Sequence, residues 1–99
     1  MAKFDVYRVG RGEDYVIDCQ ADLLSDLNTR FVVPLMPVDS APKQGARLNP
    51  VFEIDGERFA MVTQFAATMP AASLRAAVTS LVEHDLTIGN ALDMLISGF

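Results

Sequence analysis

The dipeptide Asp55-Gly56 restricts the fold of this chain more than any other short stretch, because it lies between two runs of strand-forming residues. An Asp-Gly pair readily adopts the positive backbone φ angles of a two-residue type I′ turn. Apolar and polar residues alternate on both sides of the pair, so each run presents one apolar face. The apolar positions of this alternation are Phe52, Ile54, Phe59 and Met61. The segment 49–63 is therefore predicted to form an antiparallel β-hairpin.

A second hairpin is predicted near the N-terminus. Two β-prone runs, FDVYRV and DYVIDC, flank the stretch GRGE, which contains two glycines. In the second run, Tyr15, Ile17 and Cys19 share one face of the strand, while Val16 and Asp18 share the other. Together, the two hairpins predict a β-rich chain.

The segments between and after the hairpins give less uniform signals. The run RFVVPLM predicts a strand, and Pro34 within it predicts an edge strand or a bulge, because proline has no N–H to donate to a neighbouring strand. Residues 37–47 are predicted to form a loop, and QADLLSDLNT fits either a helical turn or a loop. The alanine-rich segment after Ser73 predicts a helix.

The C-terminal segment predicts an α-helix. Ser80 and Glu83 have the spacing of a capping box at its start. Gly98 stands where a helix stop is expected. An apolar stripe with steps of seven, four and three residues would face the core, and it consists of Leu81, Ile88, Leu92 and Leu95.

Length and composition predict one domain, residues 1–99. With 51% apolar residues, the chain carries more apolar surface than one small core readily hides, which favours a homodimer. The net charge of −5 argues against direct nucleic-acid binding by the protein alone, because such binding neutralises phosphates with basic side chains.

The single cysteine and the N-terminal sequence bear on the compartment. Cys19 has no partner for an intramolecular disulfide, which fits a reducing environment. The first ten residues lack the apolar region of a signal peptide, and the most apolar run, FVVPLMPV, is too short to span a bilayer. A cytoplasmic protein without membrane contact is therefore expected.

Two sets of polar residues have catalytic or metal-binding types but simpler interpretations. Ser80, His84 and Asp85 are the residue types of a hydrolytic triad, but neighbours on one helix do not converge on one reacting atom, so His84 is expected to be solvated. Aspartates recur every four residues at Asp18, Asp22 and Asp26, as cation ligands on a helix would. Because Asp18 belongs to a predicted strand, all three are expected to be solvated surface residues.

Two further side chains could carry chemistry. Cys19 is expected to be a small buried hydrophobe, because Asp18 beside it disfavours a reactive thiolate. Arg30, which follows Thr29, could supply the cation that metal-free RNA cleavage needs, but a surface arginine is the simpler interpretation. The sequence has neither a glycine-rich phosphate loop nor metal-ligand spacing, so no catalytic residue, metal or cofactor is expected.

The order of several segments is similar to that of the CcdB family, the toxins of bacterial toxin–antitoxin pairs. The segments that carry the resemblance cover nearly the whole chain and are FDVY, DCQADLL, TRFVVPL, LNPVFEIDGERFAMVTQ and NALDMLISGF. The resemblance implies a β-rich α+β fold, an SH3-like small barrel of bent antiparallel sheet plus a minor sheet, closed by a C-terminal α-helix. It also implies a homodimer, and it speaks against the helix predicted after Ser73.

The resemblance also implies a function. Family members are not enzymes: they bind the A subunit of DNA gyrase and trap the cleaved gyrase–DNA complex, and a disordered segment of the cognate antitoxin competes for the same region. The implied gyrase-binding residues are Leu23, Leu24, Asp93, Ile96, Ser97, Gly98 and Phe99. The implied antitoxin-binding residues are Leu23, Leu24, Asp93 and Ile96.

Ser97 departs from the family pattern. Well-studied members carry a tryptophan at this position, whose indole stacks on an arginine of gyrase, and serine cannot stack. Two alternatives therefore stay open. The chain could be a CcdB-like binding module that has lost gyrase poisoning. It could also resemble the MazF-like endoribonucleases, related toxins with the same barrel, with Arg30 in the cleavage site.

Overall fold

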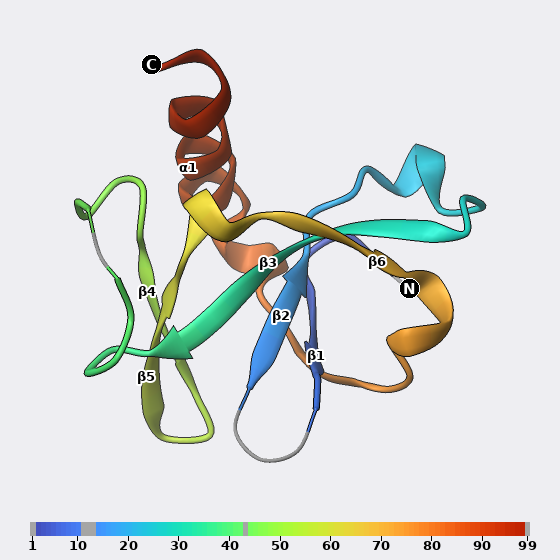
Figure 1. The fold of residues 1–99 in the computed structure, drawn as a ribbon, viewed down its shortest axis with the longest axis horizontal. Coiled ribbons are helices and arrows are strands. Elements are labelled where there is room, and N and C mark those ends of the chain that lie inside the picture. The colour runs from blue at the N-terminus through green and yellow to red at the C-terminus, as the bar shows by residue number, and fades with distance from the viewer. Residues whose placement is uncertain (1, 11–13, 43, 99) are drawn as a thin grey trace.

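The computed structural model describes residues 2–10, 14–42 and 44–98, which form a curled antiparallel sheet and one C-terminal helix (Figure 1). The strands are β1 (Asp5–Arg8), β2 (Tyr15–Asp18), β3 (Thr29–Pro37), β4 (Val51–Ile54), β5 (Glu57–Met61), β6 (Ala67–Pro70) and β7 (Ala77–Ser80). The helix is α1 (Asp85–Ser97), and short 3-10 turns occupy Asp22–Leu24, Thr63–Phe65, Ala71–Ser73 and Val82–His84. The fold class implied by the resemblance is thereby confirmed.

Strand β3 organises the sheet, whose order is β4-β5-β3-β2-β1-β7 with β6 also paired to β3. One side of β3 pairs with β2 over residues 32–35, while the other side pairs first with β6 and then with β5. This change of partner divides the sheet into a larger part and a smaller part built on the β4–β5 hairpin. Figure 1 shows β3 crossing the molecule between the two parts.

Pro34 lies where β3 changes partner. The prediction of an edge strand is wrong, because β3 has neighbours on both sides. The carbonyl of Pro34 accepts a hydrogen bond from the Val62 N–H at 2.9 Å. The nitrogen and carbonyl of one strand residue point to the same side, so the missing donor of Pro34 faces the gap between β6 and β5. Proline is tolerated there because no ladder bond is lost.

Both predicted hairpins are present. Asp55 and Gly56 form the turn between β4 and β5 with φ angles of 52° and 82°, in the left-handed region that the Asp-Gly pair predicted. The β1–β2 hairpin pairs Val6 with Ile17, and residues 11–13 of its predicted loop lie outside the described residues. In the predicted loop at 37–47, Pro37 is the last residue of β3, and the other described residues form turns and irregular structure.

The main core fills the space between the concave sheet and α1. The predicted inward positions of both hairpins all contribute to it, namely Tyr15, Ile17, Cys19, Phe52, Ile54, Phe59 and Met61. The rings of Tyr15 and Phe59 meet edge to face, with centroids 5.1 Å apart, which locks the two hairpins together across the core.

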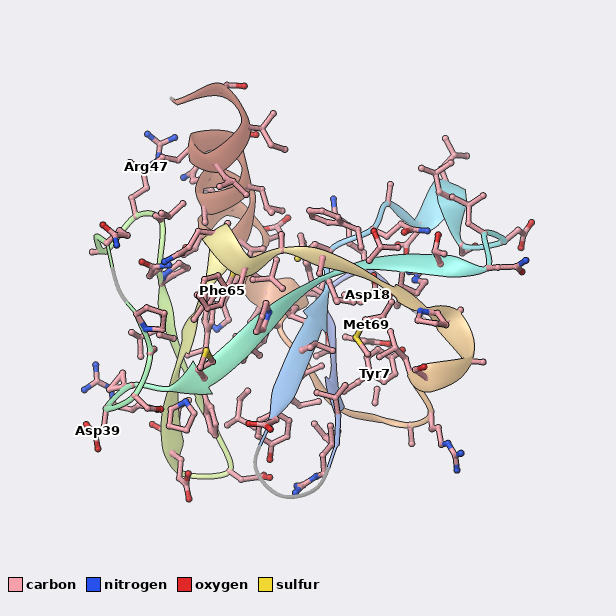
Figure 2. The ribbon with its side chains drawn as sticks, viewed as in Figure 1. Tyr7, Asp18, Asp39, Arg47, Phe65 and Met69 are labelled. Carbon is pink, nitrogen blue, oxygen red and sulfur yellow. The ribbon has the colours of Figure 1, made fainter. Side chains whose placement is uncertain are left out.

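A second, smaller cluster lies on the opposite face of the sheet. Its buried members are Tyr7, Val16, Val32 and Leu74, with Val9 and Met69 packed against them. Figure 2 shows Tyr7, Met69 and Asp18 over the same part of the sheet. The connection between β6 and β7 covers this face, which is why the chain builds a second small core there.

The helix predicted after Ser73 is wrong. The residues after Ser73 form β7 instead, and the alanines before them form β6 and the 3-10 turn Ala71–Ser73. Strand β6 pairs with β3 and strand β7 pairs with β1. These ladder bonds satisfy the backbone of the alanine-rich segment, so tertiary pairing outweighs its modest helix propensity.

The C-terminal helix starts later than predicted. Ser80 Oγ accepts from the Val82 N–H at 3.2 Å, and α1 begins only at Asp85, so the predicted capping box is not formed. Leu81 and Ile88 of the stripe are buried and Leu92 is partly buried, but Leu95 is exposed. Gly98 ends the helix with a φ of 79°, and its N–H donates to the Met94 carbonyl at 3.0 Å, as the stop signal predicted.

Candidate partner-binding surface

The residues implied as partner contacts fall into two groups. Leu23 and Leu24 lie in the 3-10 turn between β2 and β3. The other described contacts lie at the end of α1, with Asp93, Ile96 and Ser97 in its last turns and Gly98 directly after it. Phe99, the last implied contact, lies outside the described residues. Figure 1 shows the turn and the end of α1 projecting at separate places, so one chain does not join them into one patch.

The otherwise polar loop between β2 and β3 carries an apolar patch, called the loop patch here. It is formed by Leu23, Leu24 and Leu27. Leu23 is 94% exposed, and the other two are exposed as well. Sequence reasoning identified Leu23 and Leu24 but not Leu27 as a contact, although its place in QADLLSDLNT was visible. Three exposed leucines within residues 23–27 are unusual on a small domain, because an exposed apolar cluster is unfavourable in water unless a partner covers it.

The last turns of α1 carry a second set of exposed apolar side chains, called the helix patch here. It is formed by Met94, Leu95 and Ile96. Ile96 is 75% exposed, and Met94 and Leu95 are also exposed. The three residues extend over the surface of the last helical turns, ahead of Ser97 and Gly98. Met94 and Leu95 are additions that the resemblance did not name, and only the packing of α1 reveals that Leu95 faces away from the core.

A buried ion pair joins β2 and β3 where the loop that carries the loop patch leaves the sheet. Asp18 at the end of β2 and Arg30 in β3 both have side chains with 0% exposure. Asp18 Oδ2 lies 2.8 Å from Arg30 Nε and 2.6 Å from its Nη2, while Oδ1 accepts from the Gln20 N–H at 3.0 Å. The predictions of a solvated Asp18 and a surface Arg30 are both wrong, because β2 and β3 pair side by side and bury the two charges together.

The burial of Arg30 bears on RNA cleavage. A cation that stabilises a phosphorane must reach the substrate phosphate. The guanidinium of Arg30 is enclosed and engaged with Asp18, so it has no access to a ligand. The arrangement therefore provides no support for the MazF-like alternative.

Two buried groups near the ion pair have shifted pKa values. Burial, with Asp18 as the second cause, raises the pKa of the Cys19 thiol to about 12, so the thiol stays protonated. This confirms Cys19 as a small buried hydrophobe. Burial, followed by the charges of Asp5 and Asp18, also raises the pKa of Tyr7.

The candidate triad does not assemble. His84 stands at the start of α1 with a side chain that is partly exposed, its ring 5.0 Å from that of Phe52 and its Nε2 3.6 Å from Glu83 Oε1. The Ser80 hydroxyl is engaged with the Val82 N–H instead of with His84. Within residues 2–10, 14–42 and 44–98, no group of His, Cys, Asp and Glu side chains could hold a metal ion.

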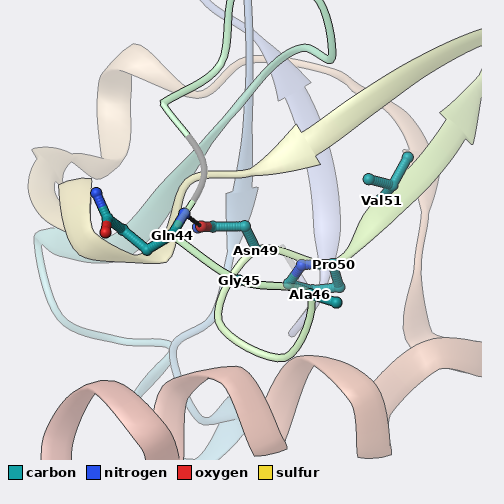
Figure 3. A pocket seen from close by; sticks show the side chains of 6 residues that line it. All are labelled: Gln44, Gly45, Ala46, Asn49, Pro50 and Val51. Atoms are coloured by element: carbon teal, nitrogen blue, oxygen red, sulfur yellow. Dashed lines mark hydrogen bonds between the residues drawn. The ribbon is translucent and has the colours of Figure 1, made fainter.

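An open hollow of about 570 Å³ lies beside the loop that precedes β4, close to α1 (Figure 3). Its lining consists of Gln44, Gly45, Ala46, Asn49, Pro50 and Val51, none of which is titratable. The amide of Asn49 is fully engaged, since it donates to the Met61 carbonyl and to Gln64 Oε1 and accepts from the Gln44 N–H. The hollow therefore has no side chain placed for catalysis.

The described residues contain no helix with the length and hydropathy of a membrane span. A comparison with protein-family models finds a match over residues 3–98 to the family described as CcdB protein. The match covers nearly the whole chain and includes the loop patch, the buried ion pair and the helix patch.

Proposed function

The chain belongs to the CcdB family, and from this premise we propose that it binds the A subunit of DNA gyrase and traps the cleaved gyrase–DNA complex. Membership implies the toxin of a toxin–antitoxin pair. In the proposed mechanism the toxin performs no chemistry. It acts by binding an intermediate of the gyrase reaction and slowing its religation.

The observation that carries the proposal is the exposure of apolar side chains in both segments that the family uses for partner contact. Leu23 is 94% exposed and Ile96 is 75% exposed. Covering an exposed leucine or isoleucine side chain gains about 1.5–3 kcal/mol. Two such patches can supply the core of an interface, with polar neighbours such as Asp93 at its rim.

A homodimer is part of the proposal. The loop patch and the helix patch lie apart within one chain, so a two-fold axis near the end of α1 would present two copies of each on one surface. Ser97, Gly98 and Phe99 would lie at the centre of that surface. The antitoxin would bind Leu23, Leu24, Asp93 and Ile96 and thereby exclude gyrase.

The test uses the purified full chain with gyrase, ATP and plasmid DNA. The proposal expects linear DNA after protein denaturation, in amounts that rise with toxin concentration. Ile96→Asp should reduce this cleavage by about tenfold or more, since a charge at the centre of an interface is strongly unfavourable. The matched control is Leu86→Asp, because Leu86 is 74% exposed on the same helix but is not an implied contact. Equal loss in both variants, or no cleavage by the wild type, contradicts the proposal.

Ser97 favours a second candidate function, a binding module that keeps the antitoxin but no longer poisons gyrase. Serine lacks the stacking surface of the family tryptophan, and a lost cation–π contact weakens binding by about 0.5–2 kcal/mol. Under this alternative the wild type binds its antitoxin without trapping gyrase, and Ser97→Trp gains cleavage activity. An RNA cleavage assay on the same preparation tests the ribonuclease alternative.

A further inference from the structure

The side chain of Gln20 connects three parts of the loop that carries Leu23 and Leu24. Gln20 follows β2 and is buried although its side chain is a polar amide. Its Oε1 accepts from the Phe31 N–H at 2.9 Å, and its Nε2 donates to the Leu24 carbonyl at 2.9 Å. Its own backbone N–H donates to Asp18 Oδ1 at 3.0 Å.

The first of these bonds extends the β2–β3 pairing. The Cys19 N–H still donates to the Phe31 carbonyl at 2.8 Å, as in a regular strand pair. Beyond this point the chain leaves the sheet, and the Gln20 amide oxygen supplies the acceptor that the Phe31 N–H would otherwise find on a neighbouring strand. The side chain therefore fixes the place where the loop begins.

The second bond fixes the turn itself. The Leu24 carbonyl accepts from both the Gln20 side chain and the Leu27 N–H. The turn is also held by two local backbone bonds, from the Leu24 N–H to the Ala21 carbonyl and from the Ser25 N–H to the Asp22 carbonyl. One further bond reaches it from the N-terminal segment, since the Lys3 N–H donates to Asp22 Oδ1 at 2.8 Å. Because Leu23 is almost fully exposed, its side chain contributes little packing that would hold the turn in place. The Gln20 amide thus links the turn to the buried strands.

We infer that Gln20 is a positioning residue, which holds the 3-10 turn Asp22–Leu24 against β3 and so presents Leu23 and Leu24 to the partner in one preformed arrangement. This inference rests on the proposed gyrase binding. A loop that is ordered before binding loses less conformational entropy when the complex forms. Gln20 itself need not touch the partner.

The test separates the two arms of the amide. Gln20→Glu keeps an oxygen for the Phe31 N–H and removes the donor to the Leu24 carbonyl. Gln20→Met removes both bonds at similar side-chain volume. Amide hydrogen exchange of residues 22–27 measures the order of the turn, and exchange of β2 and β3 measures the integrity of the sheet. Binding of the isolated gyrase A subunit to each variant measures the consequence for recognition.

Gln64→Glu is the matched control. Gln64 bonds in the same way in another loop, since its Nε2 donates to the Pro42 carbonyl at 3.0 Å and its Oε1 accepts from Asn49 Nδ2 at 2.7 Å. We expect Gln20→Glu to speed exchange at 22–27 with β2 and β3 unchanged, and to weaken gyrase A binding by about tenfold. Gln64→Glu should change neither quantity.

The outcomes distinguish the inference from the proposed function. Unchanged exchange at 22–27 in Gln20→Glu overturns the inference, as does faster exchange with unchanged binding to gyrase A. If the wild type itself does not bind gyrase A, the proposed function fails, and the exchange data alone then decide whether Gln20 positions the turn. If Gln20→Met does not fold, Gln20→Glu still decides the question.

Discussion

At the scale of single residues, the pair Asp18–Arg30 has the largest structural consequence. Both side chains lie on the face of the sheet that carries the second small cluster, and both are fully buried. Arg30 Nη1 has no hydrogen-bond partner among the described residues. The pair is therefore held through one edge of the guanidinium, and each charge depends on the other for compensation.

Removing one partner of this pair should destabilise the fold strongly. Arg30→Met leaves a buried carboxylate without its cation, and a loss of about 3–5 kcal/mol in the free energy of unfolding is expected. The double variant Asp18→Asn with Arg30→Met removes both charges and should be clearly more stable than Arg30→Met alone. Urea denaturation of the wild type, both single variants and the double variant checks this, and additive effects would contradict the coupling.

Cys19 should be unreactive in the folded protein. Burial raises its pKa from the ordinary 9.0 to about 12, so the thiolate is scarce at pH 8. A thiol reagent at pH 8 should modify the native protein far more slowly than the urea-unfolded chain. Fast labelling of the native protein would contradict the burial of Cys19.

The same shift gives a pH dependence of stability. The folded state keeps the thiol proton above pH 9, where the unfolded chain begins to lose it. The contribution of Cys19 is therefore fully present below pH 9 and is lost as the pH rises through about 12. Urea denaturation series at pH 8 and pH 10 should show a smaller decrease of stability in Cys19→Ala than in the wild type.

At the scale of secondary-structure elements, β3 and α1 position the candidate site. Strand β3 carries Arg30 at one end and changes its partner from β6 to β5 near Pro34. The loop patch is thus attached to the larger part of the sheet. Helix α1 packs through Ile88 and Ala91 and leaves its last turns outside the core, which exposes Ile96.

Replacing Gly89 by alanine should raise the free energy of unfolding. It lies inside the helix, and an added Cβ would meet no atom within 4 Å. Gly89→Ala should therefore stabilise the fold by about 0.5–1 kcal/mol. Gly56→Ala is the matched control, because its Cβ also meets open space but its φ is +82°.

Gly56→Ala should destabilise by about 1–2 kcal/mol, since an alanine is strained in the left-handed region. Thermal denaturation of the two variants beside the wild type provides the measurement. Shifts of the same sign in both variants would argue against backbone conformation as the cause.

At the scale of the whole molecule, one chain is compact but leaves two apolar patches uncovered. Its Cα radius of gyration is 12.5 Å, close to the value of about 13 Å expected for a globular chain of 100 residues. The loop patch and the helix patch nevertheless remain exposed. The single chain thus folds around its own core and leaves the apolar side chains of both patches exposed.

A homodimer is expected in solution. Light scattering at micromolar concentration should give twice the chain mass of 10.8 kDa, and small-angle X-ray scattering should give a radius of gyration above that of one chain. The physical reason is the burial of apolar surface that the single fold leaves exposed. A mass of one chain over the whole micromolar range would refute the dimer.

The sequence by itself determined the local elements. The Asp55-Gly56 turn, the two hairpins and the stop at Gly98 follow from backbone conformation and from alternation along a few neighbouring residues, and these predictions are confirmed. The order of segments also sufficed to assign the family, and with it the residues to examine on the loop and on the last helical turns.

Only the tertiary structure decided the remaining features, because they depend on partners distant in the sequence. The alanine-rich segment became strands since β3 and β1 offered it ladder bonds, and the helix start moved to Asp85. Asp18 and Arg30 are polar residues that the sequence favours on the surface, yet adjacent strands bury them as a pair. The role inferred for Gln20 depends likewise on Phe31 and Leu24, which only the folded chain brings to its two amide atoms.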